Sequence, residues 1–138
     1  MSNVSAHHNI IMNHDIDPRE ILLKELGDIS GLKLANTQFM IAIYIRPEKT
    51  KSGLFMPEQA RNEDRYQSKM GLIIKMGPSA FKDDTGKWFE GLDIKVGDWI
   101  SHRPSDGWNI TIRGVLCRMM DDSAFKMLVP DELLDSVY

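Results

Sequence analysis

Residues 37–46 have the sequence Thr-Gln-Phe-Met-Ile-Ala-Ile-Tyr-Ile-Arg, and this stretch decides the fold class. Large apolar side chains recur at every second position from Phe39 to Ile45. A period of two predicts a β-strand, because alternate side chains lie on opposite faces. Weaker strand patterns, each bounded by turn residues, follow at residues 69–76, 99–103, 108–112, 115–120 and 125–129. Many short strands at close spacing predict an all-β fold, either a small barrel or a sandwich.

The first 36 residues follow a different pattern. Asp17 is a suitable helix cap, Pro18 favours the first helical position, and Gly27 favours a helix end. We therefore expect an N-terminal extension, residues 1–36, with a short helix at about 18–26, followed by a β-barrel domain at 37–138. We expect the apolar side chains of the helix to pack on the barrel, although they could instead reinforce an assembly or contact a partner. These side chains are Ile21, Leu22, Leu23 and Leu26.

The composition is that of one ordinary globular domain. The 138 residues include 42% hydrophobic and 27% charged residues, which is enough to build a core. The net charge of −3 gives no electrostatic signature of nucleic-acid binding, and the short apolar runs indicate no membrane span or secretory signal. Cys117 is the single cysteine, so neither an internal disulfide nor a multi-cysteine zinc site is expected. We expect a cytoplasmic protein without a cofactor.

A long polar segment at residues 47–67 contains three consecutive bulky apolar residues, Leu54, Phe55 and Met56. A half-buried strand would alternate apolar with polar residues. An apolar run inside a polar loop is unfavourable unless another surface covers it. We interpret the tripeptide as a peptide that docks into a partner's groove, with Gly53 allowing the chain to turn into it. The alternative is a short core strand flanked by loops.

Five motifs follow one another in a fixed order. They lie at residues 48–53, 54–58, 71–78, 95–98 (Lys-Val-Gly-Asp) and 119–129. Together they resemble the GroES family of small co-chaperonins over roughly residues 38–137. The resemblance implies a GroES-like small β-barrel with a long mobile loop. The first 36 residues have no counterpart in the family pattern, which suggests a divergent member of the kind that large bacteriophages carry.

The resemblance implies a co-chaperonin that caps a large ATP-driven chaperonin ring, assists protein folding and is not itself an enzyme. The implied partners are a GroEL-like ring of host or phage, further copies of this chain in a seven-subunit ring, and an encapsulated client protein. Neither nucleic acid nor a membrane is expected as a partner. The docking contact is assigned to Gly53, Leu54, Phe55 and Met56, within the mobile loop at 47–67.

Residues 79–93 correspond, through the resemblance, to a hairpin that roofs the cavity of the ring. Asp83, Asp84 and Gly86 supply its turn. We expect Trp88 and Phe89 to pack on the barrel, the alternative being contact with client or a neighbouring subunit. Asp-Thr-Gly at 84–86 also matches the aspartic-protease tripeptide. It lacks the apolar strand that would bury a carboxylate pair, so we interpret it as a solvated turn.

The resemblance also implies that the first and last strands pair between neighbouring subunits. This assigns Phe39, Ile41, Phe125, Met127 and Val129 to a subunit interface, with both strands at sheet edges. The alternative is that both strands lie inside one barrel, and the sequence does not separate the two arrangements.

Other residues carry weaker signals. His7, His8 and His14 lie in a polar tail, where we expect no specific metal site. His102 lies beside Arg103 and is predicted to be a surface or interface residue, whereas Cys117 is predicted to be a small buried hydrophobe. A different class of function stays open: a β-barrel subunit of a phage particle, with residues 47–67 as an inter-subunit arm.

Overall fold

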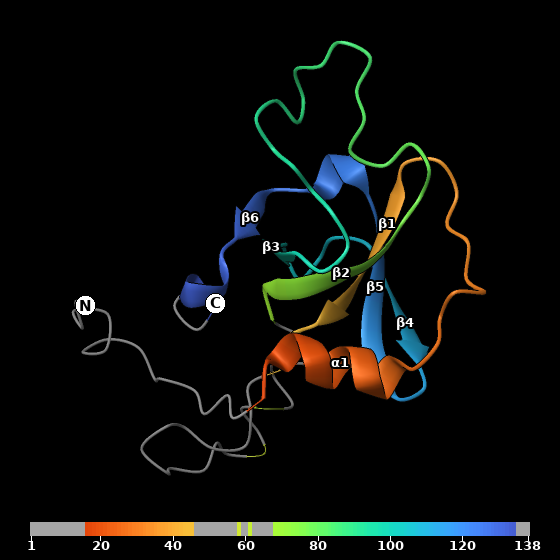
Figure 1. Cartoon of the computed structure of the whole chain (residues 1–138), viewed down its shortest axis with the longest axis vertical. Helices are drawn as coiled ribbons and strands as arrows, with labels where there is room; N and C mark the ends of the chain where they lie inside the picture. Colours follow the sequence, from red (N-terminus) through yellow and green to blue (C-terminus); the bar gives the residue numbers. More distant parts are fainter. Residues whose placement is uncertain (1–15, 46–57, 59–60, 62–67, 135–138) are drawn as a thin grey trace, which may run out of the picture.

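Six antiparallel strands and one short helix make up the part of the chain that the computed structural model describes, residues 16–45, 58, 61 and 68–134 (Figure 1). The strands form a single sheet in the order β4-β5-β1-β2-β3-β6. The predicted all-β class is therefore confirmed. The elements are α1 (Pro18–Leu26), β1 (Gln38–Ile43), β2 (Met70–Met76), β3 (Trp99–Ser101), β4 (Trp108–Ile112), β5 (Val115–Asp121), β6 (Met127–Val129), and 3-10 turns at Asp122–Ala124 and Asp131–Leu133.

β1 is a central strand of the sheet. It pairs with β2 on one side, where Ile41 lies opposite Ile73, and with β5 on the other. Both faces of β1 are covered, because Phe39 and Ile41 are fully buried in one core cluster and Ala42 is fully buried in the other. The prediction that this strand lies at a sheet edge is wrong, and the alternative that it lies inside one barrel holds for β1.

The two core clusters lie on opposite faces of the sheet. α1 covers one face with Leu22 and Leu26, which pack in the cluster that contains Trp99 and Cys117. The other face is covered by aromatic and aliphatic side chains from the segments after β2 and after β5, including Phe81, Ile94 and Phe125. In Figure 1, α1 lies below the strands, and the segment between β2 and β3 lies above them.

α1 has the bounds that its sequence signals predict. The Asp17 carboxylate accepts a hydrogen bond from the Arg19 amide at 2.9 Å, and Pro18 occupies the first turn. Gly27 ends the helix with a φ of +69°, a conformation that favours glycine. Leu26 is fully buried and Leu22 packs beside it, so the helix packs on the barrel as expected, but Ile21 and Leu23 are exposed, contrary to the prediction. Residues 16–36 therefore share a core with the strands.

Residues 79–93 differ from the expected hairpin. They form successive turns, and no strand is paired within this described segment. Gly86 donates to the Asp83 carbonyl at 2.9 Å, and the Asp83 carboxylate accepts from the amides of Lys87 and Trp88, both at 3.2 Å. Hydrogen bonds to this one carboxylate thus organise the turn, where a hairpin would have hydrogen bonds between two paired strands. Asp84, Thr85 and Gly86 are exposed, as expected for a solvated turn.

The described residues lack two kinds of feature. None of the helices within residues 16–45 and 68–134 is long and apolar enough to cross a membrane. Within the same ranges, no group of three or more His, Cys, Asp or Glu side chains could hold a metal ion.

Candidate functional site

The predicted docking residues, Gly53 and the tripeptide at 54–56, lie outside the described residues. The structure does describe the two points between which their segment runs. The Tyr44 amide donates to the Met70 carbonyl at 3.0 Å, and Ile43 lies opposite Gly71 in the β1–β2 register. Because these contacts join the end of β1 to the start of β2, residues 46–67 leave and re-enter the sheet at neighbouring positions.

Buried side chains anchor the two ends of this segment, residues 43–45 and 68–71, which we call its root. Tyr44 is buried and packs edge-on against Trp99, with ring centroids 5.6 Å apart. Ser68 is buried, and its hydroxyl bonds to both the amide and the carbonyl of Met70 at 3.2 Å. A Cβ at Gly71 would overlap the Ile41 side chain, so β1 and β2 approach closely here. The residues on either side of the segment are therefore anchored to the sheet by buried contacts.

The segment at 79–93 is held on the sheet by an aromatic cluster. Phe81 lies 4.8 Å from Phe39 and 5.5 Å from both Phe89 and Phe125, measured between ring centroids. Phe89 is thus packed as predicted, whereas Trp88 is 68% exposed, contrary to the prediction. Phe81 adopts a φ of +61°, which is unusual for a bulky residue and places its ring at the centre of the cluster.

Two adjacent carboxylates at the end of β5 accept hydrogen bonds from segments that are distant in sequence. Asp121 accepts a hydrogen bond from the Thr37 hydroxyl at 2.6 Å, and this bond is the main cause that lowers the pKa of Asp121. Asp122 is buried and accepts from the Phe81 amide at 3.0 Å. Burial raises the pKa of Asp122, and the neighbouring Asp121 charge adds to the rise. The sequence indicated an acidic turn here, but not that it bonds to Thr37 and Phe81, which are distant in sequence.

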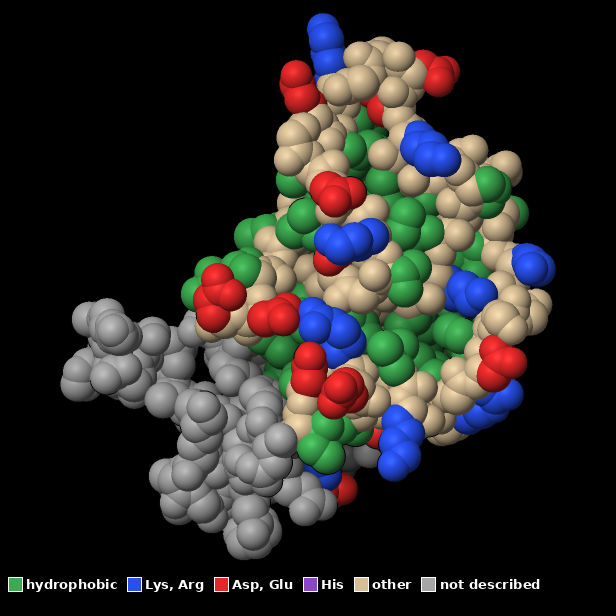
Figure 2. Space-filling model, viewed as in Figure 1, with side chains coloured by type: hydrophobic (Ala, Val, Ile, Leu, Met, Phe, Trp, Pro, Cys, Tyr) green, Lys and Arg blue, Asp and Glu red, His purple; other side chains and the backbone are tan. Residues whose placement is uncertain are grey.

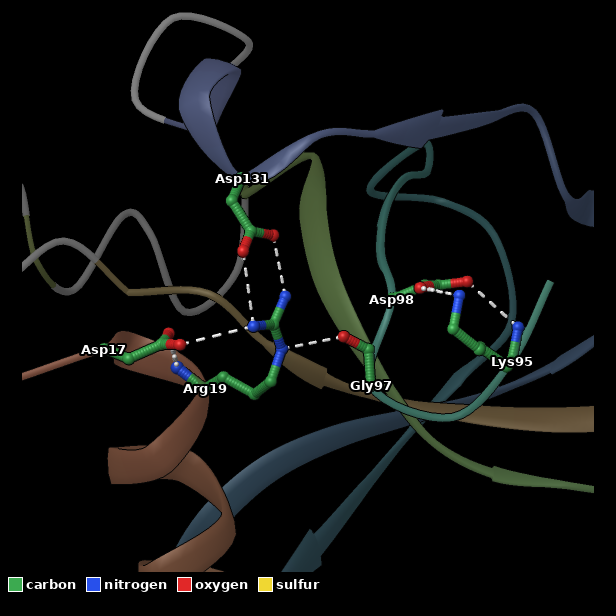
Figure 3. A network of polar contacts seen from close by, with 6 residues as sticks. All are labelled: Asp17, Arg19, Lys95, Gly97, Asp98 and Asp131. Atoms are coloured by element: carbon green, nitrogen blue, oxygen red, sulfur yellow. Dashed lines mark hydrogen bonds and ion pairs between the residues drawn. The ribbon is translucent and has the colours of Figure 1, made fainter. Parts of the chain in front are cut away.

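Arg19 of α1 forms a network that sequence reasoning missed (Figure 3). Its Nε donates to the Gly97 carbonyl at 2.7 Å, and its Nη2 donates to the Asp131 carboxylate at 2.7 Å. The guanidinium also lies 5.8 Å from the centroid of the Trp99 ring. The hydrogen bond that Arg19 donates to Asp131 is the main cause that raises the pKa of Arg19. An arginine in the first turn of a capped helix was the available signal, but its partners come from distant segments.

Gly97 belongs to the Lys-Val-Gly-Asp tetrapeptide at 95–98, which forms a tight turn. The Asp98 carboxylate accepts from the Lys95 amide at 3.0 Å and lies 3.3 Å from the Lys95 ammonium group (Figure 3). The Gly97 amide donates to Ile73 of β2 at 2.8 Å. Gly97 has a φ of +99°, so the turn needs a glycine at this position. Its carbonyl is thereby presented to Arg19.

The predicted interface residues fall into two groups. Phe39 and Ile41 are fully buried in a central strand, so the edge-strand argument for them fails. β6 ends the sheet, pairing only with β3 among the described residues, and its Met127 is exposed. Phe125 packs in the aromatic cluster, and Val129 is buried. Whether β6 contacts a neighbouring subunit stays a prediction.

His102 and Cys117 are both buried. The prediction of a surface or interface position for His102 is wrong, since its exposed fraction is 2%. The prediction for Cys117 is confirmed, and burial raises the pKa of its thiol to about 12. On the face of the described residues shown in Figure 2, acidic and basic side chains are interspersed, with hydrophobic side chains between them.

Comparison with known proteins identifies one family over most of the chain. The family model of the chaperonin 10 Kd subunit matches residues 32–125. A co-chaperonin GroES of Syntrophomonas wolfei subsp. wolfei is 32% identical over 92 residues, which cover 67% of this chain and 81% of the relative. A co-chaperonin GroES of Gemmatimonas aurantiaca is 28% identical over 76 residues, which cover 55% of this chain and 71% of the relative. α1 and β6 lie outside the matched range.

Proposed function

This chain belongs to the chaperonin 10 Kd family of GroES-like co-chaperonins, and from that premise we propose that it caps a large chaperonin ring by means of the segment at residues 47–67. The all-β sheet agrees with the GroES-like small barrel. The observation that carries the proposal is the root of the segment. Its two ends are fixed side by side, by the Tyr44–Met70 hydrogen bond and the Ile43–Gly71 pair.

The docking contact is assigned to Leu54, Phe55 and Met56, with Gly53 as the turn that precedes them. Burying each apolar side chain in a partner's groove contributes roughly 1.5–3 kcal/mol before ordering costs. Ordering a polar segment of this length opposes binding, so one segment alone binds weakly. Several segments on one rigid ring share the entropic cost of association, and avidity raises affinity by roughly 10²–10⁴. Weak single contacts also release together when the partner changes conformation.

The ring itself is part of the proposal. We place β6 at the contact between neighbouring subunits, because it is the exposed end of the sheet that the family resemblance assigns to ring closure. A seven-subunit ring, a client protein beneath it and a cytoplasmic location follow from the same resemblance. The exposed Trp88, on the segment at 79–93, is proposed to face the client or a neighbouring subunit. This role involves no covalent chemistry.

The segment should be open to protease in the free protein and protected in the complex. We expect trypsin to cut between Arg61 and Arg65 in the free ring, and adding a GroEL-like chaperonin with nucleotide to suppress that cut. An inter-subunit arm would already resist trypsin in the free oligomer, and that result would favour the phage-particle alternative.

A pair of variants assigns the contact. Phe55→Ser should abolish protection by the chaperonin while leaving the fold and the ring intact. Ile21→Ser is the matched control, because it makes the same kind of change at an exposed position of α1. Normal capping by the Phe55 variant would refute the docking role of the tripeptide.

A further inference from the structure

A polar cluster lies beneath the turn that follows β3. His102, Asp106 and Arg118 are 2%, 7% and 9% exposed, although each side chain can carry a charge. Arg118 lies on β5 opposite Ile41, and His102 follows Ile100 by two positions, so both belong on the face of the sheet that carries Ile41 and Ile100. The turn at residues 103–107 covers this face. Buried ionisable groups are rare unless they are paired or have a function.

The hydrogen bonds of His102 define its neutral form. Nδ1 lies 2.9 Å from the carbonyl oxygen of Arg103. A carbonyl only accepts, so Nδ1 carries the proton and Nε2 carries a lone pair. Nε2 is buried and has no hydrogen-bond partner among the described residues. Protonation would therefore add an N–H and a positive charge to a buried nitrogen that has no hydrogen-bond partner among the described residues.

One cation, Arg118, and one carboxylate, Asp106, act on this ring among the described residues. Arg118 donates from Nη1 to the Pro104 carbonyl, and its Nε is likewise buried without a partner among the described residues. The single carboxylate, Asp106, is already engaged by Arg103, which donates from its amide at 3.1 Å and from Nη2 at 2.9 Å. The positive charge of Lys126 also lowers the pKa of Asp106. Burial alone would raise the pKa of Asp106, but the Arg103 hydrogen bonds outweigh it and leave that pKa lowered.

These surroundings disfavour the charged imidazole. Burial is the main cause that lowers the pKa of His102, and the charge of Arg118 lowers it further. The carbonyls of Arg103 and Met70 and the charge of Asp106 act in the opposite direction and do not compensate. The direction agrees with the geometry of a desolvated ring beside a guanidinium group.

The turn connects two parts of the sheet. On one side, the His102 amide donates to the Lys69 carbonyl at 2.8 Å, directly beside the buried Ser68. On the other side, Gly107 packs so closely on β5 that a Cβ would overlap the Met119 carbonyl oxygen. Movement of the turn would therefore loosen both its contact with β5 and the start of β2.

We propose that His102 is an acid-sensitive latch: in its neutral form it holds the turn at 103–107 against β5 and the start of β2, and protonation releases this turn while the rest of the sheet stays folded. The inference concerns the free protein and does not rest on the proposed capping role. A failure of either proposal leaves the other intact.

NMR on the full chain carrying His7→Gln, His8→Gln and His14→Gln tests the latch, because His102 is then the one histidine left of the four. We expect the ring protons to titrate below the ordinary value of 6.5. We also expect the amide protection factors of His102 and Asp106 to fall about tenfold between pH 7.5 and 5, by local opening. The Gly77 amide donates to the Gln38 carbonyl at 2.7 Å, at the opposite end of β2 from Lys69, so it should keep its protection and serves as the internal control.

His102→Gln in the same background removes the titration and should abolish the pH dependence of the Asp106 amide. Titration at or above 6.5, unchanged protection at pH 5, or equal loss at Gly77 and Asp106 would each overturn the latch. An identical pH dependence in the glutamine variant would do the same. If that variant does not fold, the ring titration and the Gly77 comparison still decide.

Discussion

Replacing Arg19 with methionine should destabilise the whole sheet, although Arg19 lies in the N-terminal helix. Methionine keeps an apolar side chain of similar length and removes the guanidinium group. The lost contacts are the hydrogen bond to the Gly97 carbonyl at 2.7 Å, the ion pairs with Asp131 at 2.7 Å and with Asp17 at 3.2 Å, and the contact with the Trp99 ring. Each contact is expected to contribute a different free energy to folding, depending on how exposed the contact is.

The hydrogen bond to Gly97 dominates. It is partly buried and has a charged donor, so its removal costs about 1.5 kcal/mol or more. The Asp131 side chain is 68% exposed, so that ion pair contributes only about 0.5 kcal/mol. The contact with Trp99 adds about 0.5 kcal/mol. The sum is about 2–3 kcal/mol, which lowers the Tm of a domain of this size by roughly 5–12 °C.

Urea unfolding at a fixed protomer concentration measures this loss, with the concentration held because ring assembly also stabilises the fold. Asp131→Asn is the matched control and should cost less than about 1 kcal/mol, because it removes only the exposed ion pair. The loss of stability in Arg19→Lys should lie between these two values, because lysine keeps the positive charge but lacks the planar, forked donors of the guanidinium group. A methionine variant as stable as the parent, or an Asp131 variant just as costly, would refute the assignment of the energy to Gly97.

Two further predictions concern carboxylates and the thiol. Asp121 has a lowered pKa, so its contribution to stability is present above its ordinary value of 3.8 and is lost as the pH falls through its folded value. Asp121→Asn should therefore destabilise the fold by about 1–2 kcal/mol at pH 7 and by less at pH 3, in urea unfolding. Asp122 has a raised pKa, so its contribution is present below 3.8 and is lost as the pH rises through its folded value. Asp122→Asn, which keeps an acceptor for the Phe81 amide, should be neutral or stabilising at pH 7, and equal losses in the two variants would contradict the opposite shifts. Cys117, with a pKa raised to about 12, should react with a thiol reagent at pH 8 only after unfolding in urea, and rapid labelling of the native protein would show that the thiol is accessible.

The features that the sequence predicted correctly are local ones. The bounds of α1 follow from Asp17, Pro18 and Gly27, which act within one or two turns of the helix. β1 and β2 follow from their apolar patterns, and the family resemblance rests on short motifs in order. In each case the deciding residues are neighbours in sequence, so pattern and propensity are sufficient.

The failures share a different cause, because they depend on contacts between distant segments. β1 shows a clear alternation, but its hydrogen bonds to β2 and β5 decide whether it is central or at an edge. The turn signals at 79–93 are genuine, yet Phe81 and Phe89 pack with Phe125 and the segment forms no ladder. His102 has a polar neighbour in sequence and is buried because the turn at 103–107 folds over it.

Two described elements beyond the family match, α1 and the 3-10 turn at Asp131–Leu133, meet at a single point within it. α1 lies before residue 32 and Asp131 lies after residue 125, and Arg19 joins both to the carbonyl of Gly97. Gly97 in turn is hydrogen-bonded to β2. Because Leu26 is fully buried in the cluster that contains Trp99, removing the helix would uncover core surface as well as break these bonds. The N-terminal helix is therefore part of the folding unit of the barrel, and a chain cut to the family-matched residues is expected to fold less stably than the full chain.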